Sequence, residues 1–307
     1  MKRIPGKKYD IVGKVEGINK GENFYNTTVL IEDNQHINIK LENNETDLAL
    51  GKMYCFTVRT EERNENEIVF VNESFKMAEE VLSDDELEKY LKMFYEYAPM
   101  GLKDIKKEVE SFLNAIDNKV IYEITKHIYQ KNIKQFYLHP AATKFHHSYF
   151  GGLSYHTLSM LRLVEGFIKE YPYLNKDLLY SGIILHDMAK IDEISGVDGE
   201  YTKEGLLVGH LVMGTVNIDR VAHELGYQET EEVLMLKHII LSHHGQLIYG
   251  AAKKPQTGEA LLLWYLDTID SKLRVLGEQL ELTNEGSFTQ SVAVLDKNRF
   301  YKDKIKK

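Results

Sequence analysis

Residues 182–190, GIILHDMAK, run an apolar segment directly into a histidine and an aspartate. The periodicity places His186 and Asp187 on a mostly buried helix, where an unpaired imidazole or carboxylate costs several kcal/mol. Burial of such a pair makes physical sense if other polar groups converge on it. Further histidines and carboxylates are therefore expected on the apolar faces of other segments.

Polar side chains interrupt four other apolar helical segments. They are His156 on the apolar stripe of 153–171, His210 in LLVGHLVMG, His243 and His244 at the end of HIILSHHG, and Asp267 in LLLWYLDTI. Imidazole nitrogens and carboxylate oxygens together suit a hard or borderline divalent cation. Asp187 follows His186 directly, so its carboxylate can bridge two ions. Unrelated core or capping histidines are the alternative, which explains one histidine well and the whole ordered series poorly.

The segments that carry these residues belong to a long helical region. From LSDDELEKYL (82–91) almost to the end, the apolar periodicity is helical, and Ser83 with Glu86 forms a capping-box pair at its start. Further helices are expected over 104–116, 120–130, 153–171, 176–191, 205–225, 230–244 and 258–276. Helix-breaking prolines fall between these segments, at Pro99, Pro140, Pro172 and Pro255. The larger part of the chain is therefore predicted to be all-α.

Residues 9–77 have a different pattern. Five short segments rich in β-branched and aromatic residues, 9–18, 26–33, 36–41, 53–60 and 67–74, are separated by Gly, Asn and Asp. Five strands in so short a stretch predict a small OB-like barrel. Phe24, Tyr25 and Phe56 are candidates either for its core or for base stacking. Because residues 1–80 carry 11 Lys/Arg against 15 Asp/Glu, the core is the favoured assignment.

The predicted organisation is a small all-β barrel followed by an all-α domain. The expected boundaries are an OB-like domain at 1–78, a helical linker at 79–118, the helical domain at 119–290 and a basic tail at 291–307. From Asp296 to the end the tail has six Lys/Arg against two Asp. It is either a solvated end or an arm that faces phosphate.

Composition limits the class of protein. Cys55 is the single cysteine of 307 residues, which excludes a disulfide framework and a Cys-rich zinc site. The first ten residues have no apolar h-region, and no stretch approaches 18 uninterrupted apolar residues. A soluble cytoplasmic protein without membrane association is expected. The net charge of −9 argues against non-specific binding to nucleic acid, but metal ions can supply positive charge at a nuclease site.

From about Ser83 to Lys302 the chain resembles the HD-domain phosphohydrolase superfamily, and more narrowly the YhaM-type 3′-to-5′ exoribonucleases. The strings that carry the resemblance are PAATKFHHSYFGGLSYHTLSML, KDLLYSGIILHDMAKI, GHLVMG, EEVLMLKHIILSHHGQLIYGAAKKP, ALLLWYLDTIDSKL and DKNRFYK. The family also places an OB-type domain first. The resemblance implies one metal held by His156, His186, Asp187 and Asp267, and a second that shares Asp187 and adds His210 and His243, with His244 as a further ligand. It implies Mn²⁺, one or two ions per site, with other divalent ions able to substitute.

Other residues are candidates for catalysis or substrate binding. Lys190 lies three residues after Asp187, so it is expected on the same helix face, where it would neutralise a phosphate oxygen or position water; the alternative is a surface lysine beside the site. Asp270 is expected to pair with Arg274 or a nearby lysine and is left out of the ligands. The candidates for substrate binding are His146, His147, Gly151, Gly152, Lys253 and Lys254. The alternatives are a role in ordering the loop before the helix for the two histidines and no role for the two lysines.

The leading hypothesis is a metal-dependent 3′–5′ exonuclease. Metal-hydroxide attack on the terminal phosphodiester of single-stranded RNA, or of DNA, would release nucleoside 5′-monophosphates. A second hypothesis is a phosphohydrolase or phosphodiesterase that acts on a small or cyclic nucleotide. A third is a non-catalytic nucleic-acid-binding protein. A homo-oligomer that encloses the active site would suit an exonuclease.

Overall fold

The computed structural model describes residues 4–21, 24–41, 48–64, 67–141, 149–195 and 200–306. The chain forms two compact units, Met1–Tyr97 and Ala98–Lys307. The division between them falls inside the segment 79–118, for which a helical linker is predicted. Among the described residues, no helix combines the length and the apolar character needed to cross a membrane.

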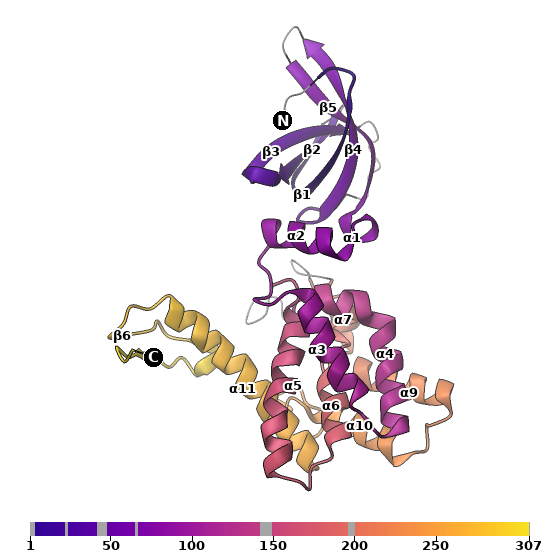
Figure 1. Ribbon diagram of the computed structural model, residues 1–307, viewed down its shortest axis with the longest axis vertical. Helices are drawn as coiled ribbons and strands as arrows, with labels where there is room; N and C mark the ends of the chain where they lie inside the picture. The colour runs from indigo at the N-terminus through magenta and orange to yellow at the C-terminus, as the bar shows by residue number, and fades with distance from the viewer. Residues whose placement is uncertain are drawn as a thin grey trace. The chain divides into compact units, whose positions relative to one another are not determined.

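The first unit is a closed five-stranded barrel (Figure 1). Its strands are β1 (Lys8–Gly21), β2 (Phe24–Ile31), β3 (Gln35–Leu41), β4 (Met53–Asn64) and β5 (Glu67–Met77), with η1 (Glu32–Asn34) between β2 and β3. The order around the barrel is β1-β2-β3-β5-β4, with β3 and β5 parallel and the other pairs antiparallel. The prediction of an N-terminal β-barrel is confirmed, and the architecture is consistent with an OB-like fold.

Alternate residues of the strands fill the barrel. Val15, Val29 and Ile39 are completely buried, and Tyr25 and Phe56 lie among them in the same core. These two rings are therefore core residues, as favoured from the acidity of the segment. The side chain of Phe24 lies outside the described residues. Two short helices follow, α1 (Ala78–Val81) and α2 (Asp84–Phe94), and α2 begins with the predicted capping box of Ser83 and Glu86.

The second unit is helical. Its helices are α3 (Leu102–Asn114), α4 (Lys119–Leu138), α5 (Gly152–Glu170), α6 (Lys176–Leu185), α7 (Lys190–Glu193), α8 (Lys203–Leu207), α9 (His210–Leu225), α10 (Glu231–Ser242) and α11 (Gly258–Glu281), with η2 (Leu247–Tyr249) before α11. Helix α6 packs against α3, α4, α5, α10 and α11. It is buried almost all round, as expected for a helix that is apolar on every face. A side chain at Gly182 would meet Ile239 at 2.8 Å and Leu263 at 3.0 Å, so this glycine permits the close packing of α6 on α10 and α11.

Several helices end earlier than the periodicity predicts. The prediction of one helix over 176–191 was wrong, because α6 ends at Leu185 and α7 begins at Lys190. The prediction of one helix over 205–225 was also wrong: Gly209, with φ 78° and ψ 153°, separates α8 from α9. Helix α10 ends at Ser242 rather than at His244. As a result, His186, Asp187, His210 and His243 all lie at helix ends, where the chain can turn polar groups toward one point.

The C-terminal segment forms a small structure of its own. Helix α11 runs outward from the other helices and carries the hairpin of β6 (Ser287–Phe288) and β7 (Tyr301–Lys302), with η3 (Ala293–Leu295) between its strands (Figure 1). Val275 on α11 packs with Val292 and Leu295. The Lys302 ammonium donates to the carbonyls of Leu280 and Thr283 at 2.7 and 2.8 Å. This tail cation therefore caps the end of α11, where the helix dipole favours positive charge.

Candidate metal centre

Asp187 lies at the middle of the histidines singled out in the sequence. Its Oδ2 is 3.3 Å from His186 Nε2, and its Oδ1 is 3.4 Å from His210 Nε2 and 3.6 Å from His243 Nε2. On the side of α5 and α11, His156 Nε2 is 3.3 Å from Asp267 Oδ1. One carboxylate thus faces ligand-type nitrogens with both of its oxygens, which is the geometry a bridging ligand requires.

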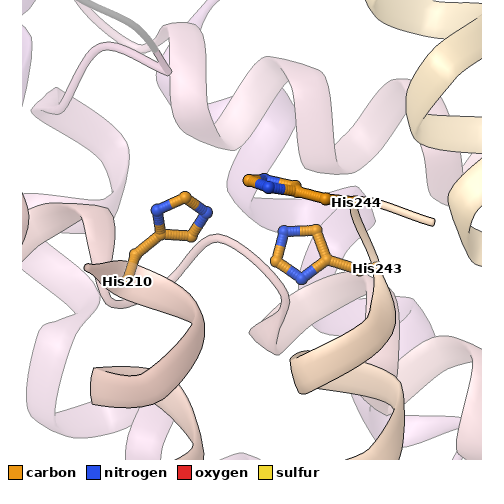
Figure 2. Close-up of side chains that lie close together, drawn as sticks. All are labelled: His210, His243 and His244. Carbon is orange, nitrogen blue, oxygen red and sulfur yellow. The ribbon is translucent and has the colours of Figure 1, made fainter. Parts of the chain in front are cut away.

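The donor atoms form two adjoining groups. One consists of His156, His186 and Asp187, and the other of His210, His243 and His244; in each, a set of ligand-type atoms lies within 4.8 Å of one another. Figure 2 shows the second group, with His210 at the start of α9 and the other two rings just after the end of α10. The rings of His186 and His243 join the groups, with centroids 5.3 Å apart. Two neighbouring ions would fit this arrangement.

The other nitrogen of each ring is held by the protein. The Nδ1 atoms of His186, His243 and His244 lie 2.7–2.8 Å from the backbone carbonyls of Ile183, Ile240 and Tyr249. A carbonyl only accepts, so Nδ1 must donate, and in the neutral ring the lone pair is then on Nε2. His156 Nδ1 instead bonds Asp270 Oδ2 at 2.7 Å, and His210 Nδ1 bonds Glu193 Oε2 at 2.8 Å. Partners of this kind fix the orientation and tautomer of metal-ligating histidines.

The donor set fits a divalent cation. Within the described part of the chain, His186 Nε2, His210 Nε2, His243 Nε2 and Asp187 Oδ1 are buried and have no hydrogen-bond partner. Each such atom costs about 1–3 kcal/mol when left unsatisfied. Four of them directed at one region are the signature of a ligand that the protein is built to hold. Imidazole and carboxylate donors suit Mn²⁺, Fe²⁺, Co²⁺ or Zn²⁺ and do not select one among these.

Charge and burial prepare these groups for a cation. Burial lowers the pKa values of His210 and His243, and that of His244 falls to about 4, so their rings are neutral near pH 7. Burial alone would also lower the pKa of His156, but Asp267 and Asp270 raise it to about 10. Burial would raise the pKa of Asp187, yet Lys190 and His186 hold it well below its usual value. Asp187 is therefore ionised at all ordinary pH values.

Lys190 contacts the centre directly. Although it starts α7 rather than continuing α6, its ammonium donates to Asp187 Oδ2 at 2.7 Å, and its side chain is only 18% exposed. Burial would lower its pKa, but Asp187 raises it, so the amine stays charged. The structure thus brings Lys190 to the Asp187 carboxylate and not to an open surface.

Two residues of the centre were missed in the sequence. Asp270, which was expected to pair with Arg274 or a nearby lysine, is buried and accepts from His156. Its position three residues after Asp267 on one helix face was the available signal. Glu193 is also buried and accepts from both the backbone amide and the ring of His210. It lies on a helix of four residues, which is too short for periodicity to reveal, so no sequence pattern indicates its role.

The predicted substrate-binding residues lie before or at the start of α5 and in the segment between η2 and α11. Gly151 precedes α5 in a left-handed conformation (φ 76°), and Gly152 is the first residue of that helix, so the chain turns tightly just before the helix that carries His156. Lys253 and Lys254 are exposed in the segment between η2 and α11. His146 and His147 lie outside the described residues. Contact of any of these with substrate stays a prediction.

Known proteins similar to this chain match it over the segment that carries the candidate metal ligands. The HD domain family matches residues 153–272, a range that contains every histidine and aspartate of the two groups. Proteins named 3′-5′ exoribonuclease YhaM from Bacillus licheniformis and Bacillus pumilus are 42% and 40% identical over 210 residues, which is 68% of this chain and 67% of each relative. The chain belongs to the YhaM exoribonuclease family. Its relative in Geobacillus sp. (strain WCH70) is 40% identical over the same length, and there the match covers 64% of the relative, a little under two thirds. The YhaM resemblance of the sequence is thereby confirmed.

Proposed function

We propose that this protein is a metal-dependent 3′–5′ exonuclease that shortens single-stranded RNA and releases nucleoside 5′-monophosphates. One observation carries the proposal. The unpartnered Nε2 atoms of three histidines converge on Asp187, whose Oδ1 is also unpartnered, and all four residues lie inside the segment matched by the HD domain. The class of substrate and the 3′-to-5′ direction of degradation are proposed from the YhaM relatives, since these are named as 3′-5′ exoribonucleases.

The proposed metal ligands are those of the two groups together with Asp267. His156, His186, Asp187 and Asp267 would hold one ion, and Asp187, His210, His243 and His244 the other. When bound, a divalent pair polarises a phosphodiester and ionises the attacking water. We propose Mn²⁺ as the resident ion.

The residues of the site are proposed to have separate roles in metal binding and substrate binding. Asp187 keeps its negative charge because Lys190 and His186 stabilise it. The Lys190 ammonium neutralises part of that charge through its contact with Asp187, and we propose that it also meets a phosphate oxygen of the substrate. Lys253 and Lys254 are proposed to contact the RNA backbone, and Gly151 and Gly152 to let it approach the start of α5. A homo-oligomer enclosing this site is part of the same proposal.

A 5′-labelled single-stranded RNA of about 20 nucleotides tests the reaction. It is incubated with protein and Mn²⁺, with EDTA, or with the Asp187→Ala variant. A ladder that shortens from the 3′ end one nucleotide at a time, absent with EDTA and with the variant, is the expected result. Parallel single-stranded DNA and cyclic nucleotides define the substrate class. Intact RNA beside hydrolysed cyclic nucleotide would contradict the exonuclease and favour a small-molecule phosphodiesterase with the same centre.

A further inference from the structure

Three consecutive large apolar residues are exposed beside the metal centre. Leu247, Ile248 and Tyr249, which form η2, are 60%, 83% and 64% exposed. Exposed apolar residues are common singly, but a run of three at a functional site indicates a contact surface. We refer to Leu247–Tyr249 as the apolar tip.

The segment that carries the apolar tip is anchored on both sides. Gly245 (φ 74°) packs so closely on Trp264 that an added side chain would lie 2.0 Å from the indole ring. After the tip, Gly250 (φ 89°) turns the chain, Ala251 is buried, and the amide of Ala252 donates to the carbonyl of Leu241 at 3.1 Å. The tip is therefore held out to solvent by fixed ends, as expected of a preformed binding surface.

The apolar tip is also tied to a candidate metal ligand. The ring of His244 donates from Nδ1 to the carbonyl of Tyr249 at 2.8 Å, and the same ring lies in the group with His210 and His243. The backbone of the tip is thus one imidazole ring away from the atoms that would hold the scissile phosphate. In a polynucleotide, the group that lies within one nucleotide of each phosphate and offers an apolar face is the base.

The geometry points to the apolar tip as the platform on which a nucleobase next to the scissile phosphate stacks. This inference rests on the proposed function and names the part of the substrate that the tip contacts. Aromatic and aliphatic side chains accept any base face, so the platform holds RNA without reading its sequence. The Tyr249 ring is its principal element, and Ile248 extends its apolar surface.

The test pairs a change in the protein with removal of the base. Tyr249→Ala, Tyr249→Phe and Ile248→Ser are compared with the unchanged protein on two labelled RNAs, one with a normal 3′-terminal nucleotide and one with an abasic terminal nucleotide. Leu282→Ala is the matched control, because Leu282 is equally exposed at the far end of α11. The carbonyl that binds His244 remains in every variant, so bound Mn²⁺ per chain, measured by mass spectrometry of the metal, is expected to stay unchanged.

The expected result is a loss of discrimination in two of the variants. The unchanged protein, Tyr249→Phe and Leu282→Ala should prefer the normal terminus in kcat/KM by about 5- to 150-fold, the factor for a stacking contact of about 1–3 kcal/mol. Tyr249→Ala and Ile248→Ser should lower this preference, chiefly through a higher KM. Equal preference in all proteins would overturn the platform while leaving the exonuclease intact. Altered sedimentation of the tip variants with unchanged preference would overturn it too, and would assign the tip to contact between copies of the chain. RNA left intact by the unchanged protein would overturn both proposals.

Discussion

Each histidine around Asp187 has its Nδ1 atom held by the protein. The partner that holds it differs within each of the two groups. His156 and His210 have a carboxylate behind the ring, whereas His186, His243 and His244 have a backbone carbonyl. A carboxylate makes the imidazole a stronger donor to a metal. Each group therefore contains one strengthened ligand, held by Asp270 or by Glu193.

The two supporting carboxylates can be removed one at a time. Asp270→Asn and Glu193→Gln should each weaken metal binding by about 10- to 100-fold, because the ring loses its charged partner. The two losses should fall on different ions, so titration calorimetry with Mn²⁺ should show one weakened and one normal site in each variant. Glu110→Gln is a control on α3, and it should leave both sites unchanged. Equal weakening of both sites by either variant would contradict the assignment.

The raised pKa of His156, about 10, predicts proton release on metal binding. Below that value the metal-free ring is an imidazolium, and coordination through Nε2 must displace its proton. His210, His243 and His244 have lowered pKa values and are already neutral at pH 7. About one proton per chain should therefore leave between pH 7 and 9, and apparent affinity should rise about tenfold per pH unit over that window.

Calorimetry in buffers of different ionisation enthalpy measures this proton directly. Asp270→Asn should reduce the release, because the pKa of His156 falls when one of its two carboxylates is removed. A binding enthalpy that does not depend on the buffer would show that no proton leaves and that His156 is neutral before the metal binds.

The ligand types were predictable at this scale, but Glu193, the carboxylate that holds the ring of His210, was not. A histidine or an aspartate on an apolar face is visible in the sequence because it breaks the periodicity of its own helix, as His156 and Asp267 do. Glu193 has no such background, since α7 spans only four residues. Its role follows from the turn that brings it under α9, which is a tertiary feature.

At the scale of elements, the ends of the helices build the centre. The periodicity located the helices but extended α6 and α10 through the histidines that follow them, because residues 186–191 and 243–244 contain no proline or glycine to mark an earlier end. Gly209 broke the predicted helix at 205–225 by its conformation, and a single glycine within a helical pattern is an ambiguous signal. The sequence therefore predicted which segments meet more reliably than where each one stops.

The turn before α5 gives a prediction of its own. Gly151 has φ 76°, and a side chain there would meet Leu102 at 3.1 Å and Ala98 at 3.3 Å. Gly151→Ala should lower the free energy of unfolding by about 1–2 kcal/mol, the cost of a left-handed residue with a Cβ, plus the cost of these contacts. Thermal unfolding followed by circular dichroism measures it.

Gly166→Ala, inside the helix that follows this turn, is the matched control. A side chain at Gly166 has nothing within 4 Å, and alanine in a helix interior gains about 0.5–1 kcal/mol over glycine. The two substitutions should thus shift the melting temperature in opposite directions. A loss of stability in both would mean that α5 does not tolerate alanine for a reason other than the conformation at residue 151.

At the scale of the whole molecule, the two-part architecture was the easiest feature to predict. The change from alternating to helical periodicity near Ser83 separates a β segment from an α segment, and the structure has a barrel and a helical unit. The compact units divide at Tyr97, however, because α1 and α2 belong with the barrel. Composition cannot show which unit a short amphipathic helix joins, since either core offers an apolar surface.

Metal removal should destabilise the helical unit. Ions bind the folded centre and not the unfolded chain, so Mn²⁺ at about 100 times its Kd should add about 2.7 kcal/mol to the free energy of unfolding. A thermal scan with and without EDTA measures the shift, and Asp187→Ala should show almost none. An equal response of this variant to Mn²⁺ would place the stabilising ion elsewhere in the molecule.

The contact between Gly245 and Trp264 makes the centre observable by light. Trp264 is the single tryptophan of the chain, and it touches the residue that follows His244. Intrinsic emission excited at the red edge of protein absorption therefore comes from one indole at the root of the apolar tip. Occupancy of the neighbouring ligands by an ion, and of the tip by a strand, can each be followed in real time without any attached dye.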